Sequence, residues 1–182
     1  MGATISTDPL LSVTALGAHF GYYFSEYFSL NLLGWKAWTG TTSSFNALNA
    51  SIQSTNGINI IPDSNYQNGY LGGETSFSLL YGKLSLLGQA IIYYDLHFLA
   101  GAGVMLTQTG NDLAPSLGIG QSIYLTKNLA VRVDYRLMGY QENLLYKANP
   151  AVAGQINPNS RINFTNVVSI GFDILFGPGS KK

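Results

Sequence analysis

Apolar and polar residues alternate along most of this chain with the period of a β-strand. The clearest stretch is 164–176, where every second residue from Phe164 to Phe176 is apolar except Asn166, and the residues between them are smaller and more polar. Successive side chains of a strand point to opposite faces, so the stretch predicts a strand with one strongly apolar face. That face ends on aromatic residues, which suits a strand leaving a lipid bilayer at the level of the headgroups.

Six earlier stretches show the same alternation and predict six more strands. They lie at 12–24, 27–39, 73–83, 91–107, 114–125 and 129–142. In the third of these, the pattern places Phe77, Leu79 and Tyr81 on the apolar face and Glu74, Ser76 and Ser78 on the polar one.

The connections between these stretches are alternately short and long. Residues 25–26, 85–90 and 126–128 are predicted turns, whereas 40–69, 108–113 and 143–160 are predicted loops. In the first loop Phe45, Leu48 and Ile52 have helical spacing, which predicts a short amphipathic helix at 43–54 lying over the mouth of a barrel. Outer-membrane barrels have short periplasmic turns and long extracellular loops, so the C-terminus is expected in the periplasm.

The composition of the chain favours a membrane barrel over a water-soluble domain. Its 182 residues suit one domain, yet only 10% are charged, 46% are hydrophobic, and the net charge is zero. Soluble domains carry about a quarter charged residues, and a spanning helix needs about 18 consecutive apolar residues, which this chain lacks. The absence of cysteine is compatible with an oxidising envelope. A water-soluble β-sandwich or lipocalin-like barrel is the alternative.

We therefore predict an all-β fold, an antiparallel transmembrane β-barrel in a bacterial outer membrane. The single domain covers 1–182, with a lead at 1–11, a long extracellular loop at 40–69 and a periplasmic tail at 177–182. Seven strands are recognisable, but bacterial barrels nearly always have an even number, so about eight are expected in the complete barrel. The lead has no signal peptide, so we expect a processed, engineered or truncated chain, with a first strand absent, donated by a partner or overlooked.

The last eight strand residues carry a recognisable pattern: a polar residue, then glycine, an apolar residue and a terminal aromatic. This pattern resembles the C-terminal signal by which bacterial outer-membrane barrels are recognised for assembly. The residues that match it are Ser169, Gly171, Phe172, Ile174 and Phe176.

Three further segments carry a family resemblance: Tyr81–Leu84 (YGKL), Asp95–Val104 (DLHFLAGAGV) and the stretch 129–140. Together they resemble the small outer-membrane β-barrel domain proteins of myxobacteria and related predatory bacteria. The resemblance spans nearly the whole chain and implies an additional N-terminal strand. It implies no chemistry for any residue.

Most charged residues of the predicted strands fall on the inward parity: Glu74, Asp95, Arg132, Asp134, Arg136 and Asp173. Lys36 has outward parity and is tolerable only near the interface, where its ammonium can snorkel. An outward arginine at the bilayer midplane would cost about 2–4 kcal/mol, so this sorting supports the predicted register. A lumen of about eight strands is narrow enough for side chains to fill, so the charges are expected to pair into a polar core. The predicted lumen network consists of Glu74, Asp95, His97, Arg132, Asp134, Arg136 and Asp173.

The leading functional hypothesis is a non-enzymatic barrel with a structural or partner-binding role through its extracellular loops or an open seam. A narrow passive channel or porin-like pore is the alternative, because a ring of charge also screens permeants. A lipid-modifying enzyme is a third hypothesis: Asp95, His97 and a serine at 76 or 78 sketch a hydrolase site, although Asp and His two residues apart in a strand are expected to be too distant for direct bonding.

Other chemistry finds little support in the sequence. No catalytic residue, metal site or cofactor is predicted, because two histidines with scattered carboxylates lack ligand spacing and no phosphate-binding loop is present. The neutral chain offers no basic stripe for nucleic acid. The expected partners are outer-membrane lipid, the barrel assembly machinery during insertion, and another protein chain supplying or covering a strand edge.

Overall fold

The computed structural model describes residues 11–56, 65–86, 90–145 and 155–176. Seven strands and one helix make up this part of the chain. Their bounds are β1 (Leu11–Tyr23), β2 (Phe28–Thr41), α1 (Ser43–Asn56), β3 (Gln67–Leu86), β4 (Ala90–Thr107), β5 (Asn111–Tyr124), β6 (Leu129–Leu145) and β7 (Ile156–Ile174). Among the described residues, no helix is both long and apolar enough to cross a bilayer.

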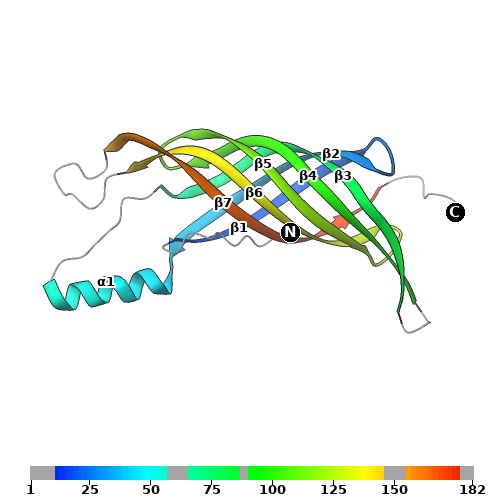
Figure 1. The fold of residues 1–182 in the computed structure, drawn as a ribbon, viewed down its shortest axis with the longest axis horizontal. Helices are drawn as coiled ribbons and strands as arrows, with labels where there is room; N and C mark the ends of the chain where they lie inside the picture. Colours follow the sequence, from blue (N-terminus) through cyan, green and yellow to red (C-terminus); the bar gives the residue numbers. More distant parts are fainter. Residues whose placement is uncertain (1–10, 57–64, 87–89, 146–154, 177–182) are drawn as a thin grey trace.

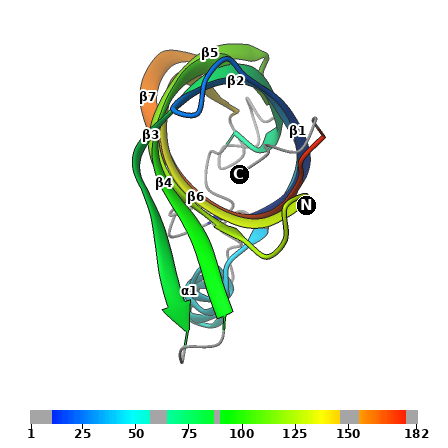
Figure 2. The same ribbon diagram turned by 90° about the vertical axis from the view of Figure 1, so that its right-hand side faces the viewer.

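The seven strands form one sheet in which each strand pairs antiparallel with its neighbours in sequence, in the order β1 to β7. The sheet curls strongly, so that β1 and β7 come to face each other when the molecule is viewed along its length (Figures 1 and 2). The prediction of seven antiparallel strands in an all-β fold is therefore confirmed. The concave face of this curled sheet is called the interior below.

Several strands are longer than the sequence predicted. β3 occupies 67–86 instead of 73–83, and the final strand begins at Ile156, so the predicted loops 40–69 and 143–160 are both too long. Half of the predicted loop 108–113 is likewise strand, because β5 begins at Asn111. The alternation of inward and outward side chains continues into these extensions. It is hard to recognise in the sequence, because some outward positions hold polar residues or proline.

A β-bulge interrupts the pairing of β3 with β4 between Ser78 and Leu80. The extra residue shifts the inward parity, so that Tyr81 lies directly opposite Asp95, an interior residue. The prediction that Tyr81 faces outward with Phe77 and Leu79 is therefore wrong. Beyond the bulge, the β3–β4 hairpin extends past the curled sheet and away from it (Figure 2).

The predicted helix in the first long connection is confirmed as α1, but its predicted position is wrong. α1 lies beside the curled sheet and outside its outline, not over the opening (Figures 1 and 2). Leu48 is exposed on it. α1 contains no charged residue and lies apart from the sheet, at the end where the long connections are.

The two faces of the sheet differ in character. The outward positions of every strand carry large apolar side chains that remain exposed, such as Leu32 on β2, Ile119 on β5 and Phe172 on β7. The buried residues lie in the interior, where small and polar side chains alternate with a few large ones. The core of this molecule therefore lies in the interior of the curled sheet.

The two edge strands run in the same direction. Leu11 pairs with Thr41 and Tyr23 with Ser29, so β1 runs from the end with the long connections to the end with the tight turns. β7 does the same, since Ile156 pairs with Leu145 near the long connection and Ile174 with Leu129 at a tight turn. Within the described residues β1 has one sheet neighbour, β2, and β7 has one, β6. We call this unpaired junction the seam.

Candidate functional site

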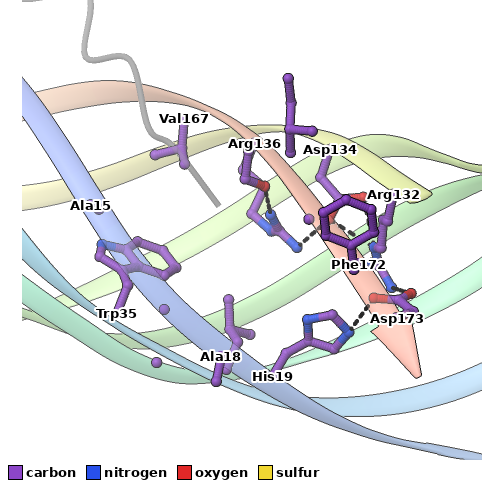
Figure 3. Close-up of a pocket in the computed structure, with 16 residues that line it drawn as sticks. Ala15, Ala18, His19, Trp35, Arg132, Asp134, Arg136, Val167, Phe172 and Asp173 are labelled. Carbon is purple, nitrogen blue, oxygen red and sulfur yellow. Dashed lines mark hydrogen bonds and ion pairs between the residues drawn. The ribbon is translucent and has the colours of Figure 1, made fainter. Parts of the chain in front are cut away.

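The seven ionisable residues predicted to share a lumen are brought together in the interior by ion-pair contacts. Four of them, Arg132, Asp134, Arg136 and Asp173, are seen in Figure 3. Six of the seven are buried, and Asp95 is half-buried. β6 supplies the centre of this cluster, because its inward positions place Arg132, Asp134 and Arg136 in a row two residues apart. β3, β4 and β7 supply the surrounding carboxylates and the histidine.

Arg136 makes the best-formed contacts of the network. Its Nε and Nη2 donate to the two carboxylate oxygens of Glu74 at 2.8 and 2.7 Å, a bidentate arrangement across the interior. Nη2 also donates to Asp134 at 3.0 Å, and Nη1 donates to the hydroxyl of Ser169 at 3.0 Å. Glu74 is 3% exposed, so this pair is removed from water.

Arg132 links the carboxylates of three strands. Its Nε donates to both oxygens of Asp134 at 2.8 and 2.9 Å. Its Nη2 lies 3.7 Å from Glu74, and its Nη1 lies 3.9 Å from Asp173. The guanidinium therefore connects β6 to β3 on one side and to β7 on the other.

His97 contacts a carboxylate with each ring nitrogen. Nε2 lies 3.1 Å from Asp134, and Nδ1 lies 3.4 Å from Asp95, two residues away on the same strand. Asp95 and His97 were expected to be too far apart for an easy direct hydrogen bond, and the structure brings them within ion-pair distance. Asp95 is also bonded to Ser78 across the β3–β4 pair.

Carboxylates outnumber arginines in the network. Two arginines face four carboxylates, and three of these carboxylates, Asp95, Asp134 and Asp173, also contact a histidine. His19 on β1 contacts Asp173 on β7 at 3.1 Å across the seam, which extends the network to an edge that the sequence did not connect to it (Figure 3). Every charged group in the interior cluster thus has an oppositely charged or potentially charged neighbour.

Glycines provide the space for these side chains. A Cβ placed on Gly120 would overlap Asp134 Oδ1 and His97 Nε2, and one placed on Gly101 would lie 2.7 Å from the Cβ of Glu74. Gly101 thus lets β4 approach β3 closely at Glu74. The network therefore requires glycine at these positions of β4 and β5.

An apolar layer lies beside the charged cluster in the interior. Its buried members are Leu33, Tyr70, Met105, Ala114, Met138, Tyr140 and Val167. Trp35 packs on this layer and stacks on Tyr70 with ring centroids 4.3 Å apart. The interior therefore holds two kinds of packing, ionic and apolar, beside a cavity that Trp35, Arg132 and Arg136 line.

A second polar network, which the sequence did not predict, lies toward the long connections. Glu142 is 1% exposed and accepts from Arg161 at 2.8 Å and from Asn163 at 3.1 Å. Gln67 donates to the hydroxyl of Tyr140 at 2.8 Å, and Asn163 donates to the same hydroxyl at 3.0 Å. The sequence analysis placed Gln67 in a loop and began the last strand after Asn163, so it did not connect these residues with Tyr140 and Glu142 on β6.

Among the described residues, those of the hypothesised hydrolase site are not connected as a triad. A triad needs the imidazole on the serine hydroxyl, but Ser76 is bonded to Ser29, Ser78 is bonded to Asp95, and the ring of His97 is held between two carboxylates. No group of three or more metal-ligating side chains suitable for an ion occurs within the described residues.

The residues of the C-terminal pattern follow the two-faced alternation of β7. Ser169 and Gly171 lie on the interior side, Ser169 bonded to Arg136, whereas Phe172 and Ile174 are exposed on the outer face. Phe176 lies just beyond the strand and is 92% exposed. This strand therefore ends on exposed aromatic and apolar side chains.

Comparison with known proteins adds no relative. No protein-family model, curated protein or solved structure matches the chain.

Proposed function

We propose that this chain is a transmembrane β-barrel of a bacterial outer membrane, with its C-terminal strand ending on the periplasmic side. In this proposal its interior is plugged, and its role is structural or partner-binding rather than catalytic or conducting. One observation carries the proposal: a single sheet exposes large apolar side chains on its outer face while its charged side chains pair inside. That is the reverse of a water-soluble protein, and it suits hydrocarbon as the outer solvent.

The height of the apolar outer band supports a bilayer. On β2 the exposed aromatic residues Phe28 and Trp38 lie ten residues apart. At roughly 3.4 Å per residue and a tilt of about 40°, they are separated by about 26 Å along the membrane normal, close to the roughly 25 Å band of outer-membrane barrels. Lys36 is exposed near the Trp38 end, where its ammonium reaches the interface.

The filled interior argues against a pore. The bidentate Arg136–Glu74 pair and the stacked Trp35–Tyr70 pair lie in the space that a channel would need for water. An eight-stranded barrel is just wide enough for side chains to fill. Function would then lie at the surfaces that remain: the connections at the α1 end, the outer band and the seam.

The membrane part of the proposal is tested by refolding the full chain from urea in three media: buffer, nonionic detergent micelles and phosphatidylcholine vesicles. We expect β-sheet circular dichroism and protease resistance in micelles and vesicles, and aggregation in buffer. A folded monomer in detergent-free buffer would overturn the proposal, since an outer face selected for hydrocarbon does not stay dispersed in water.

The plugged interior is tested by recording from planar bilayers that contain the refolded chain. We expect no steady current. A steady current that Arg132→Ala or Asp173→Ala alters would show instead that the charged cluster lines a narrow pore.

A further inference from the structure

We infer that the far end of the β3–β4 hairpin lies on the periplasmic leaflet of the membrane and binds phospholipid at the level of the headgroups. The inference deepens the proposed function and rests on it, because it takes a bilayer to surround the outer face. The segment concerned is β3 residues 80–86 paired with β4 residues 90–96, which we call the extension. It stands outside the outline of the curled sheet, at the end with the tight turns (Figures 1 and 2).

The extension leaves the sheet at the edge of the apolar outer band. Phe77 is the last residue of β3 in register with β2, and it lies opposite Phe28, which marks the tight-turn end of the band. The β-bulge between Ser78 and Leu80 follows at once, and a bulge bends the strand that carries it. β3 therefore turns outward at the level where acyl chains give way to headgroups.

The outer face of the extension continues the apolar outer face of the sheet. Leu96 precedes the inward His97 and so points outward, and Leu80 lies opposite it. The alternation from this pair toward the tip gives the outward side chains Leu80, Leu84, Ile92, Tyr94 and Leu96. Leu80 is 61% exposed and Leu84 is 53% exposed. Where a wall bends outward its outer face turns toward the bilayer, so these side chains meet the leaflet.

The opposite face of the extension suits headgroups and water. Tyr93 stacks on Tyr81 with ring centroids 6.2 Å apart, and Nζ of Lys83 lies 5.2 Å from the centroid of the Tyr93 ring. Ser85 and Ile91 form an opposed pair on the same face, nearer the tip. Tyrosine and lysine favour the membrane–water interface, where an ammonium can reach a lipid phosphate.

The backbone of the extension limits how deep it can lie. Within the described residues the register of β3 with β2 ends at Phe77, and that of β4 with β5 begins at Tyr93, so both edges near the tip lack a strand neighbour. Unpaired backbone N–H and C=O groups are strongly unfavourable in hydrocarbon, whereas exposed leucines are unfavourable in water. The headgroup level offers water and phosphate to the edges and acyl chains to the leucines, so it satisfies both.

Lipid suits the outer face of the extension better than another part of the same chain. The neighbouring turns at this end close their own hairpins, through hydrogen bonds from Phe24 N to Phe28 O and from Leu125 N to Leu129 O. The tail 177–182 reads GPGSKK and holds no large apolar side chain that could cover leucine. The long connections join strands at the opposite end of the sheet. The face is, moreover, continuous with the outer band on the same two strands.

The test places one spin label at a time on the full chain, refolded in vesicles of phosphatidylcholine and phosphatidylglycerol. The chain contains no cysteine, so each single-cysteine variant carries its label at one site. Leu84→Cys puts the label on the outer face of the extension, and Lys83→Cys, the matched control, puts it on the opposite face one residue away. Ile119→Cys on the outer face of β5 is the reference for a lipid-facing site.

Power-saturation EPR compares the access of each label to oxygen, which concentrates in lipid, with its access to a water-soluble nickel chelate present on both sides of the bilayer. We expect the label at 84 to favour oxygen, at a shallower depth than the label at 119, and the label at 83 to favour nickel. The same preference at 84 and 83 would overturn the inference, and so would a depth at 84 as great as that at 119. Low access of the label at 84 to both reagents would also overturn it, because protein and not lipid would then cover this face.

These outcomes are separable from failure of the membrane proposal. A label at 119 that favours oxygen, together with a label at 84 that favours nickel, refutes the placement of the extension alone. A label at 119 that favours nickel refutes the membrane environment on which both proposals rest.

Discussion

The pair Arg136–Glu74 offers the sharpest test of whether the interior is dry and packed. Arg136→Met keeps most of the side-chain volume but removes two hydrogen bonds to Glu74, one to Asp134 and one to Ser169. The nearest remaining cationic group to Glu74 is then Arg132, whose Nη2 lies 3.7 Å from the carboxylate, too far for a hydrogen bond. Removing one partner of a buried ion pair typically costs about 3–5 kcal/mol, because the other charge is left uncompensated.

The matching changes form a cycle: Arg136→Met, Glu74→Gln, and both together. We expect each single variant to lose about 3–5 kcal/mol of unfolding free energy and the double variant to lose less than either, because no buried charge is then left without its partner. The assay is urea unfolding in micelles, followed by tryptophan fluorescence, since Trp35 stacks inside the same interior. Single variants that lose less than about 1 kcal/mol, with no coupling, would refute the reasoning and indicate a hydrated interior in which water replaces the lost partner.

Three further changes follow from the same structure. Gly120→Ala should destabilise the chain by about 1–3 kcal/mol in urea unfolding, because the added Cβ meets Asp134 and His97. The control Gly40→Ala has no atom within 4 Å of its Cβ and should change stability by less than about 0.5 kcal/mol. Similar losses at both sites would contradict the close packing around Gly120. Ile119→Arg on the outer face should cost about 2–4 kcal/mol of folding free energy in vesicles, and a neutral result there would place this face in water. Arg161→Ala should lower the free energy of unfolding by about 1–3 kcal/mol, because the buried carboxylate of Glu142 loses its hydrogen bond from Arg161. Thermal unfolding in micelles measures this loss. Full stability would mean that the contact does not hold Glu142.

The charged interior was largely predictable because the alternation of a strand leaves few choices. Once Phe172 and Ile170 are assigned outward, Asp173 must face inward, and the same parity on β6 collects Arg132, Asp134 and Arg136. Parity does not reveal which charges meet. The approach of Asp173 to His19 depends on how far the sheet curls, which is a property of the whole sheet and of no local segment.

The errors of the sequence analysis have local physical causes. The β-bulge after Ser78 reverses the parity within an unbroken strand, so Tyr81 was placed on the wrong face. The start of β7 was missed because Pro158 and several polar residues obscure its alternation, although Ile156 and Ile162 keep the outward apolar period. Reading that weaker period would have found Arg161 as an inward neighbour of β6.

The pairing of each strand with its sequence neighbour has a consequence for the order in which the molecule forms. Each hairpin closes over a short stretch of chain, whereas contact between His19 and Asp173 joins the two extremes of the polypeptide. By the logarithmic scaling of closure entropy, that junction costs about 1.5 kcal/mol more than closing the connection between β2 and β3. The two ends therefore meet last, and an assembling chain spends the preceding steps as an open ribbon to which another segment has access.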